Sequence, residues 1–417
     1  MAVVVNGTER GAGVTVEELD SSRGFRAPGT ARMIAGSLVG AVAAYLFQVV
    51  GGRRLGTAAF APIALLWTVF FIAATVMLIP LEQFVTREAG RGRRVLRSDR
   101  GVMTLIVVLT ATALGLFVYA LRERLFANDP IFALQAFLIT IGFGFMQIGK
   151  GILAGHRRFA QYGSVLALEG IIRLGAAIVF LAFSPTASSL GWAMVAAPIA
   201  VFIVAPWRHD RETVVGVVAT PARGFLSSYV AGAAASQILL GGAPLGVAAL
   251  GGGEALRSVI FATFTLYRAP LTLIYNLQGR VLSLLVRLDD GMAIRRLAVR
   301  VAIIGTGVIV LAGFIGLTVG PAVVEVLYGA EFRPMAMVTA LAAAGVITAS
   351  ITQILSQALV AGGSTGELAG AWVGGLIFGL GAMTFWSGTP DTRVAVGFVV
   401  GEVVALALAT WRILRTR

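Results

Sequence analysis

The stretch WRHDRETVVGVVATPAR, Trp207 to Arg223, is the polar segment that decides the fold, because long apolar runs lie on both sides of it. It divides the 417 residues almost evenly, with 206 before it and 194 after it. The whole chain is 58% hydrophobic and only 13% charged, with a mean hydropathy of +0.89. A water-soluble core cannot enclose so much apolar surface, so the composition predicts a membrane protein.

Twelve apolar runs are long enough to span a membrane, since a spanning helix needs about 20 apolar residues. Six precede the polar segment and six follow it: 33–51, 60–81, 101–121, 130–153, 162–183 and 189–206, then 224–243, 258–278, 301–320, 334–361, 367–386 and 394–411. We therefore expect an all-α integral membrane protein with about 12 transmembrane helices in two pseudo-symmetric six-helix bundles. The predicted parts are a disordered cytoplasmic tail, two bundles, a linker and a second tail: 1–30, 31–206, 207–223, 224–412 and 413–417.

The positive charges indicate which way the chain crosses the membrane. If the N-terminus is cytoplasmic, 23 of the 33 Lys and Arg residues lie in inside segments, seven in outside loops and three within spans. The net charge of +13 therefore follows membrane topology, and we expect no nucleic-acid partner. Both termini are predicted to be cytoplasmic. Because 32 of these residues are Arg, as in GC-rich genomes, we expect a bacterial inner membrane.

The densest basic cluster lies in REAGRGRRVLRSDR, between the second and third runs. It holds Arg87, Arg91, Arg93, Arg94, Arg97 and Arg100. One interpretation is a stop signal that keeps this loop inside. The other is attraction of anionic lipid headgroups or a lipid pyrophosphate, since each basic residue near such a surface contributes about 1 kcal/mol. Both interpretations can hold together.

Glycine accounts for 52 residues, and some occur four residues apart, as in Gly36 and Gly40 or Gly375 and Gly379. This spacing lets helix backbones approach closely, so we expect these pairs to pack helices together. The alternative is that they allow helices to bend during transport.

Charges within the spans are costly and usually face an interior, so they are the candidate site residues. Glu169 and Arg173 are four residues apart and share a helix face, either as a structural pair or as cavity lining. Arg268 lies near the centre of the eighth run, with no acidic residue within one helical turn. It is predicted to bind substrate phosphate, or else to pair with a distant acid such as Glu402. Pro270 is the expected hinge.

Two further carboxylates are candidates for carrying a coupling proton. Glu82 follows Pro80 at the inner end of the second run, where snorkelling or pairing is the alternative. Glu402 is mid-span in the twelfth run. Lys150, near a cytoplasmic end, is expected to snorkel. The chain has no cysteine and no metal-ligand cluster, so we expect neither a metal site nor a cofactor.

Three stretches carry a family resemblance: LGTAAFAPIALLWTVFFIAATVMLIPLEQFVTREAG (55–90), GKGILAGHRRFAQYGSVLALEGIIRLGAAIVF (149–180) and VLYGAEFRP (326–334). They resemble the polysaccharide-transporter branch of the multidrug/oligosaccharidyl-lipid/polysaccharide flippase superfamily. The resemblance implies a V-shaped pair of bundles that flips a polyprenyl-pyrophosphate-linked saccharide to the outer leaflet by alternating access, for cell-envelope polysaccharide synthesis. It also implies membrane lipids, and glycosyltransferases or a polymerase of the same pathway, as partners.

Other functions remain open. Lipid II flippases usually have two further spans and charges in the first span, and multidrug exporters of the superfamily use acids in the first, seventh or tenth span. None of these features is predicted here. A membrane glycosyl-transfer enzyme would need catalytic groups outside the membrane, but the longest external loop, of about 14 residues, holds no such constellation. A non-transporting scaffold for cell-wall assembly is the remaining alternative.

Overall fold

A computed structural model describes residues 29–210, 222–269, 271, 291–361 and 365–415. The tail before residue 29, most of the polar linker and Pro270 lie outside these ranges, so the predictions made for them stay predictions. Within the described ranges the chain forms helices and turns, with no strand. The predicted all-α membrane fold is confirmed.

The N-terminal half, residues 29–210, contains the helices of the first six predicted spans. They are α2 (Thr30–Ala73), the π-helix η2 (Ala74–Leu78), α3 (Ile79–Gly90), α4 (Val95–Ser98), α5 (Arg100–Ala120), α6 (Arg122–Leu125), α7 (Ile131–Gly155), α8 (Phe159–Phe183), α9 (Ala187–Ala196), α10 (Ile199–Val204) and the 3-10 helix η3 (Pro206–His209). The sixth predicted span is thus divided into α9 and α10, with Pro198 at the break because proline cannot continue the hydrogen-bond ladder.

The C-terminal half begins at residue 222. Its elements are α11 (Ala222–Gly241), α12 (Ala243–Ala249), α13 (Glu254–Tyr267), α15 (Gly291–Thr318), α16 (Gly320–Tyr328), the 3-10 helix η4 (Ala330–Phe332), α17 (Ala336–Ala361), α18 (Thr365–Phe385) and α19 (Pro390–Arg415). The longest predicted external loop is therefore mostly helical, because α16 and η4 occupy it.

Nine helices of the described residues are long and apolar enough to cross a membrane, or ten if the bent pair Gly232–Gly241 and Ala243–Ala249 is one span. The first of the nine, Thr30–Gly90, is 61 residues long, which corresponds to roughly 90 Å. A hydrocarbon core is only about 30 Å thick. This segment turns at Gly56, whose φ of 74° and ψ of 174° are not helical, so it contains the first two predicted spans. The eighth predicted span lies partly outside the described residues.

Corresponding helices pack together in the two halves, as the predicted pseudo-symmetry requires. In the N-terminal half α2 packs on α8, α5 on α7, and α8 on α9. The equivalent pairs of the C-terminal half are α11 with α18, α15 with α17, and α18 with α19. Each half is therefore a bundle built from the same pairs of spans.

The glycine pairs lie where helix backbones touch, as expected. A Cβ on Gly40 would stand 2.6 Å from the carbonyl oxygen of Leu166, which brings α2 against α8. A Cβ on Gly375 would stand 2.6 Å from the carbonyl oxygen of Gly401, and Gly379 meets Gly397 in the same way, which brings α18 against α19. The prediction that these glycines serve packing is confirmed, whereas a role in bending stays a prediction.

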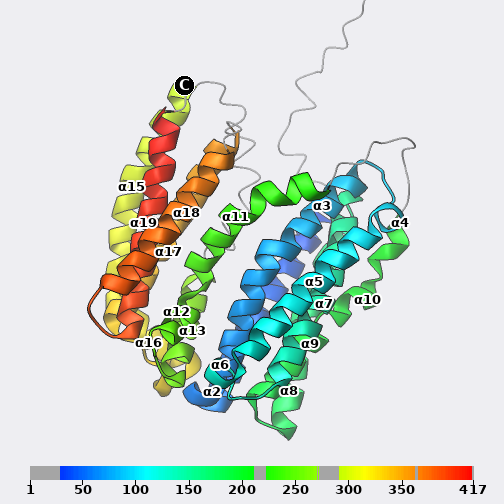
Figure 1. Cartoon of the computed structure of the whole chain (residues 1–417), viewed down its shortest axis with the longest axis horizontal. Coiled ribbons are helices and arrows are strands. Elements are labelled where there is room, and N and C mark those ends of the chain that lie inside the picture. Colours follow the sequence, from blue (N-terminus) through cyan, green and yellow to red (C-terminus); the bar gives the residue numbers. More distant parts are fainter. Residues whose placement is uncertain (1–28, 211–221, 270, 272–290, 362–364, 416–417) are drawn as a thin grey trace, which may run out of the picture.

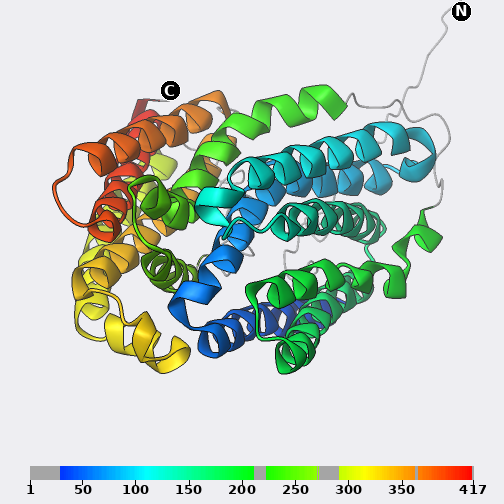
Figure 2. The same cartoon turned by 60° about the horizontal axis from the view of Figure 1, so that its bottom comes forward.

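The two halves lie together at one end of the molecule and diverge toward the other (Figure 1). α12, α13, α16 and the turn in α2 are at the end where they meet, and the C-terminal end of α19 is at the other. Helix α11 packs both on α18 and on α2, η2 and α3, so it runs between the halves, as the turned view also shows (Figure 2). We call the end with the turn in α2 the closed end.

Candidate functional site

The closed end is held by aromatic side chains from both halves. Phe60 of α2 lies 5.9 Å from Phe261 of α13 and 6.2 Å from Phe332 of η4, measured between ring centroids. Tyr328 of α16 lies 5.5 Å from Phe332 and packs on Gly52 of α2. All four rings are buried, and they belong to one apolar cluster that continues into the N-terminal half. Burial of this size stabilises contact between the halves at this end.

Two charged side chains cap helices across the same contact. Arg53 of α2 donates from Nε to the carbonyl oxygen of Leu327 at 2.6 Å and from its terminal nitrogen to that of Val326, at the C-terminal end of α16. In return, Glu331 accepts a hydrogen bond of 3.4 Å from the N–H of Thr57, where α2 resumes after Gly56. A cation at a helix C-terminus and an anion at a helix N-terminus both interact favourably with the helix dipole. Neither Arg53 nor Glu331 has a role that the sequence pattern predicts.

Arg268 lies between the halves rather than in the middle of a long helix. α13 ends at Tyr267, so the helix is interrupted just before Pro270, which itself lies outside the described residues. The Arg268 guanidinium stands beside Gly241 of α11, where a Cβ would be 3.7 Å from one terminal nitrogen, and its charge acts on the Tyr45 hydroxyl of α2. Tyr45 in turn donates to the carbonyl oxygen of Thr265 at 3.3 Å.

Glu402, named above as an example of a distant acid for Arg268, is not its partner in this structure. Glu402 of α19 is fully buried, and neither of its carboxylate oxygens has a hydrogen-bond partner among the residues that the structure describes. Glu402 lies instead in the interior of the C-terminal bundle, on α19, which packs on α17 and α18.

Glu169 and Arg173 form the predicted ion pair on α8. The Arg173 guanidinium also lies over two aromatic rings of α2, 5.1 Å from the centroid of Trp67 and 5.8 Å from that of Phe47. The side chains of Glu169 and Arg173 are 12% and 11% exposed, so this ion pair is largely enclosed between α8 and α2. A role in lining a substrate cavity stays a prediction.

Glu82 takes part in a buried polar network within the N-terminal bundle. Its carboxylate accepts from Lys150 Nζ at 2.8 Å and from the Tyr162 hydroxyl at 2.7 Å, while Lys150 also donates to Gln147 at 2.7 Å. This network joins α3, α7 and α8. The prediction that Lys150 snorkels is wrong: it is 7% exposed because Glu82 neutralises it inside the bundle.

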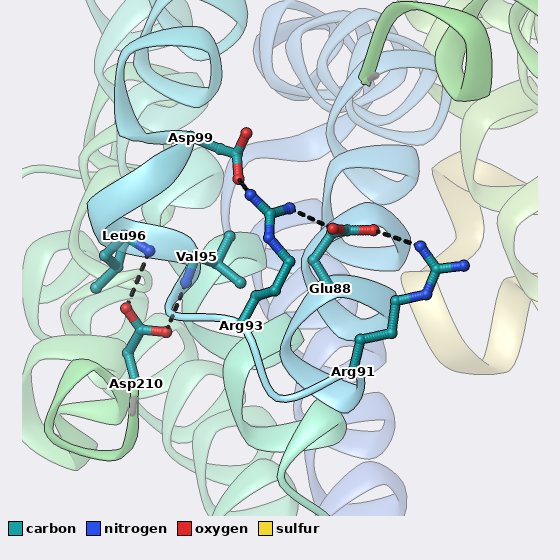
Figure 3. Close-up of polar contacts among 7 residues, drawn as sticks. All are labelled: Glu88, Arg91, Arg93, Val95, Leu96, Asp99 and Asp210. Carbon is teal, nitrogen blue, oxygen red and sulfur yellow. Dashed lines mark hydrogen bonds and ion pairs between the residues drawn. The ribbon is translucent and has the colours of Figure 1, made fainter. Parts of the chain in front are cut away.

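The basic cluster is partly neutralised by neighbouring carboxylates (Figure 3). Glu88, which is fully buried, pairs with Arg91 at 3.2 Å and with Arg93, and Arg93 also reaches Asp99 at 3.2 Å. Asp210, at the other end of the bundle's sequence, accepts hydrogen bonds from the N–H groups that begin α4. The loop is therefore an ordered turn. The remaining members of the cluster have exposed side chains and keep the loop's outer surface positive: Arg87, Arg94, Arg97 and Arg100.

No group of three His, Cys, Asp or Glu residues within the described ranges is placed to hold a metal ion. The polar groups gathered between the halves are instead Arg268, Tyr45 and the capping pair of the closed end. This arrangement offers a cation at depth beside a contact between two bodies, which suits binding an anion and changing conformation.

No known family model matches the chain. Similar proteins include two uncharacterised proteins of Mycobacterium tuberculosis. One is 26% identical over 408 residues, which cover 93% of this chain and 92% of the relative. The other is 27% identical over 401 residues, which cover 91% and 90%.

The fold is shared with transporters. An inward-facing multidrug resistance MATE family transporter of the MOP superfamily superimposes with a TM-score of 0.66 at 12% identity, over 88% of this chain and 94% of that one. An outward-facing member gives 0.56 at 12% identity over 93% and 94%, and a Vibrio cholerae MATE transporter gives 0.57 at 15% over 95% and 98%. At these identities the likeness establishes the fold, that of two six-helix bundles.

Proposed function

We propose that this chain is an alternating-access transporter of the bacterial inner membrane that flips a polyprenyl-pyrophosphate-linked saccharide from the cytoplasmic to the outer leaflet. The observation that carries the proposal is the contact between the two halves at the closed end, with the halves diverging toward the other end. Rocking of two pseudo-symmetric bundles about a central site is the usual motion of such transporters. With both termini cytoplasmic, the closed end faces outward and this state is inward-facing.

Arg268 is assigned to the pyrophosphate of the substrate. An uncompensated charge within the membrane costs several kcal/mol or more, so a cation at depth lowers the barrier for an anionic headgroup. The guanidinium lies beside a glycine and between the halves, where a substrate must pass. An inside-negative potential adds a driving force of about 2.3 kcal/mol per charge for each 100 mV. We infer that Arg173 assists only if substrate enters between α2 and α8.

The test compares Arg268→Ala with Arg268→Lys in proteoliposomes that hold a fluorescent polyprenyl-pyrophosphate saccharide, with flipping followed by quenching from outside. Ala should lower the rate at least tenfold, because charge-assisted hydrogen bonds of about 1.5–3 kcal/mol are lost. Lys keeps the charge without the bidentate geometry and should retain part of the rate. Arg54→Ala, which removes an equal charge next to Arg53, is the control and should flip at the wild-type rate. Wild-type flipping by Arg268→Ala contradicts the phosphate assignment.

A multidrug exporter is the second candidate, because the structures that share the fold include multidrug resistance transporters. Against it, the first, seventh and tenth predicted spans carry no acidic residue to attract a cationic drug. The same proteoliposomes separate the two functions: uptake of a lipophilic cation without flipping of the lipid-linked saccharide would favour drug export.

The orientation of the chain in the membrane is tested by reporter fusions at Asp129 and Asp391, expected outside, and at Asp99, expected inside.

A further inference from the structure

Glu402 of α19 carries a fully buried carboxyl group. Both of its oxygens lack a hydrogen bond within the described part of the chain. Glu88, the other fully buried glutamate, pairs with two arginines, and Glu82 binds Lys150 and Tyr162. Among the described residues, no hydrogen bond compensates the burial of the Glu402 carboxyl.

Within the described ranges, the helices that pack on α19 contain few titratable residues. α19 packs on α11, α12, α15, α17 and α18. α12 and α17 contain no titratable residue. The titratable residues of the other three helices occur near helix ends: Arg223 and Tyr229 of α11, Arg295, Arg296 and Arg300 of α15, and Glu367 of α18. Glu367 pairs with Arg412 at 3.4 Å. On α19 itself, Arg393 and Arg412 are the nearest charges along the helix, nine and ten residues away, or roughly 14 and 15 Å.

Burial without a hydrogen bond from a described residue determines whether the Glu402 carboxyl is protonated. An ionised carboxylate in an apolar interior costs many kcal/mol unless it is paired, so a group in such a place neutralises instead. A proton is the simplest cation that does so. Na⁺ fits poorly, since transporter sites for Na⁺ draw on carbonyls of unwound helices. Here α17 and α19 are continuous, and the hydroxyls of Thr348 and Thr352 donate to carbonyls of their own helix.

We propose that Glu402 is a proton-binding site whose occupancy is coupled to the position of α11. In this state the carboxyl holds its proton. Leu239 of α11 packs over the neighbouring Gly401, at 2.5 Å from where a Cβ would stand, and α11 is the helix that runs between the halves. When the halves move, displacement of α11 admits water, the O–H bond breaks, and the proton passes to that water and leaves a carboxylate. Only the use of this proton for transport rests on the proposed function.

Infrared spectroscopy of the full chain in nanodiscs, without substrate, tests the site directly. Wild-type protein at pH 7 should show the carbonyl stretch of a protonated carboxyl, and Glu402→Gln should lose that band while keeping the fold. The double variant Glu82→Gln with Lys150→Met is the matched control, because it removes a paired carboxyl without stranding the lysine, and the band should remain. Glu402→Leu provides a second variant should Gln disturb packing. A wild-type spectrum without the band, or a band unchanged in both Glu402 variants, overturns the proposal.

Coupling is tested by measuring the distance between labels on the two halves as pH is raised. Cysteines at Asn128 and Ser387, on exposed loops of the two halves, carry the labels in a chain that has no native cysteine. One linked proton changes the ratio of the two conformations by up to tenfold per pH unit. We expect that dependence in wild-type protein and a flat profile in Glu402→Gln. A flat wild-type profile overturns the coupling, and a shift caused by Na⁺ in place of choline at constant pH overturns the choice of proton. Neither measurement uses the lipid-linked saccharide, so both stand if flipping fails.

Discussion

Arg53→Ala should open the closed end. The replacement removes the hydrogen bonds from Arg53 to the carbonyl oxygens of Val326 and Leu327, and with them a positive charge at the C-terminus of α16. A hydrogen bond to a charged group is worth about 1.5–3 kcal/mol, and exposure to solvent reduces that value. Because Arg53 is exposed, we take about 2 kcal/mol for the two bonds together. Every 1.4 kcal/mol is a factor of ten, so the ratio of closed to open molecules should fall about 30-fold.

The assay is the distance between spin labels on cysteines at Asn128 and Ser387. A population at longer distance should grow in Arg53→Ala. Arg54→Ala is the matched control, since Arg54 is the adjacent exposed arginine and the structure shows it no hydrogen bond or ion pair to the other half. If Arg53→Ala gives the wild-type distribution, the aromatic cluster alone holds the closed end. If Arg54→Ala gives the same shift as Arg53→Ala, loss of charge rather than loss of the cap is the cause.

Three further replacements test how the halves and bundles are held. Phe332→Ala removes a buried ring, at a cost of about 3–5 kcal/mol, and should open the closed end more than Arg53→Ala in the same distance measurement. Gly40→Leu should lower the unfolding temperature in detergent through overpacking of about 1–3 kcal/mol against α8, whereas Gly175→Leu, with nothing within 4 Å, should leave it unchanged. Glu82→Gln strands a buried Lys150 and should cost about 3–5 kcal/mol, most of which the double variant with Lys150→Met should restore. Wild-type stability of Glu82→Gln would contradict the view that Glu82 compensates the burial of Lys150.

The sequence predicted the architecture because it depends on properties that are local in the chain. Apolar runs of spanning length mark helices, and glycines four residues apart mark faces where helices touch, so Gly40 and Gly375 were identified before any contact was known. The ion pair of Glu169 with Arg173 was predictable for the same reason, since residues four apart on a helix are neighbours. Breaks were harder to locate, and the turn at Gly56 had no distinctive signal in a chain with 52 glycines.

Contacts between distant segments were not predictable from the pattern. Arg53 and Leu327 are 274 residues apart, and nothing near Arg53 indicates that it caps a helix of the other half. The position of Lys150 near the end of an apolar run predicts that it reaches water, yet Glu82 from another helix pairs with it and makes its burial less costly. One signal was available for the closed end: Gly329 precedes Glu331 and Phe332 in VLYGAEFRP, and a charged and aromatic segment between two apolar runs suggests a contact surface.

The closed end also indicates how substrate could drive the conformational change. A ligand shifts an equilibrium only by its difference in affinity for the two states. The Tyr45 hydroxyl, which donates to the carbonyl oxygen of Thr265 across the halves, lies within the field of Arg268. A phosphate drawn to Arg268 therefore arrives beside a hydrogen bond between the halves, and it can offer the tyrosine hydroxyl an anionic acceptor in place of the carbonyl. Binding then removes one hydrogen bond between the halves and weakens the closed end. Under the proposed function, inorganic pyrophosphate should lengthen the Asn128 to Ser387 distance in wild-type protein, and Tyr45→Phe should abolish that change.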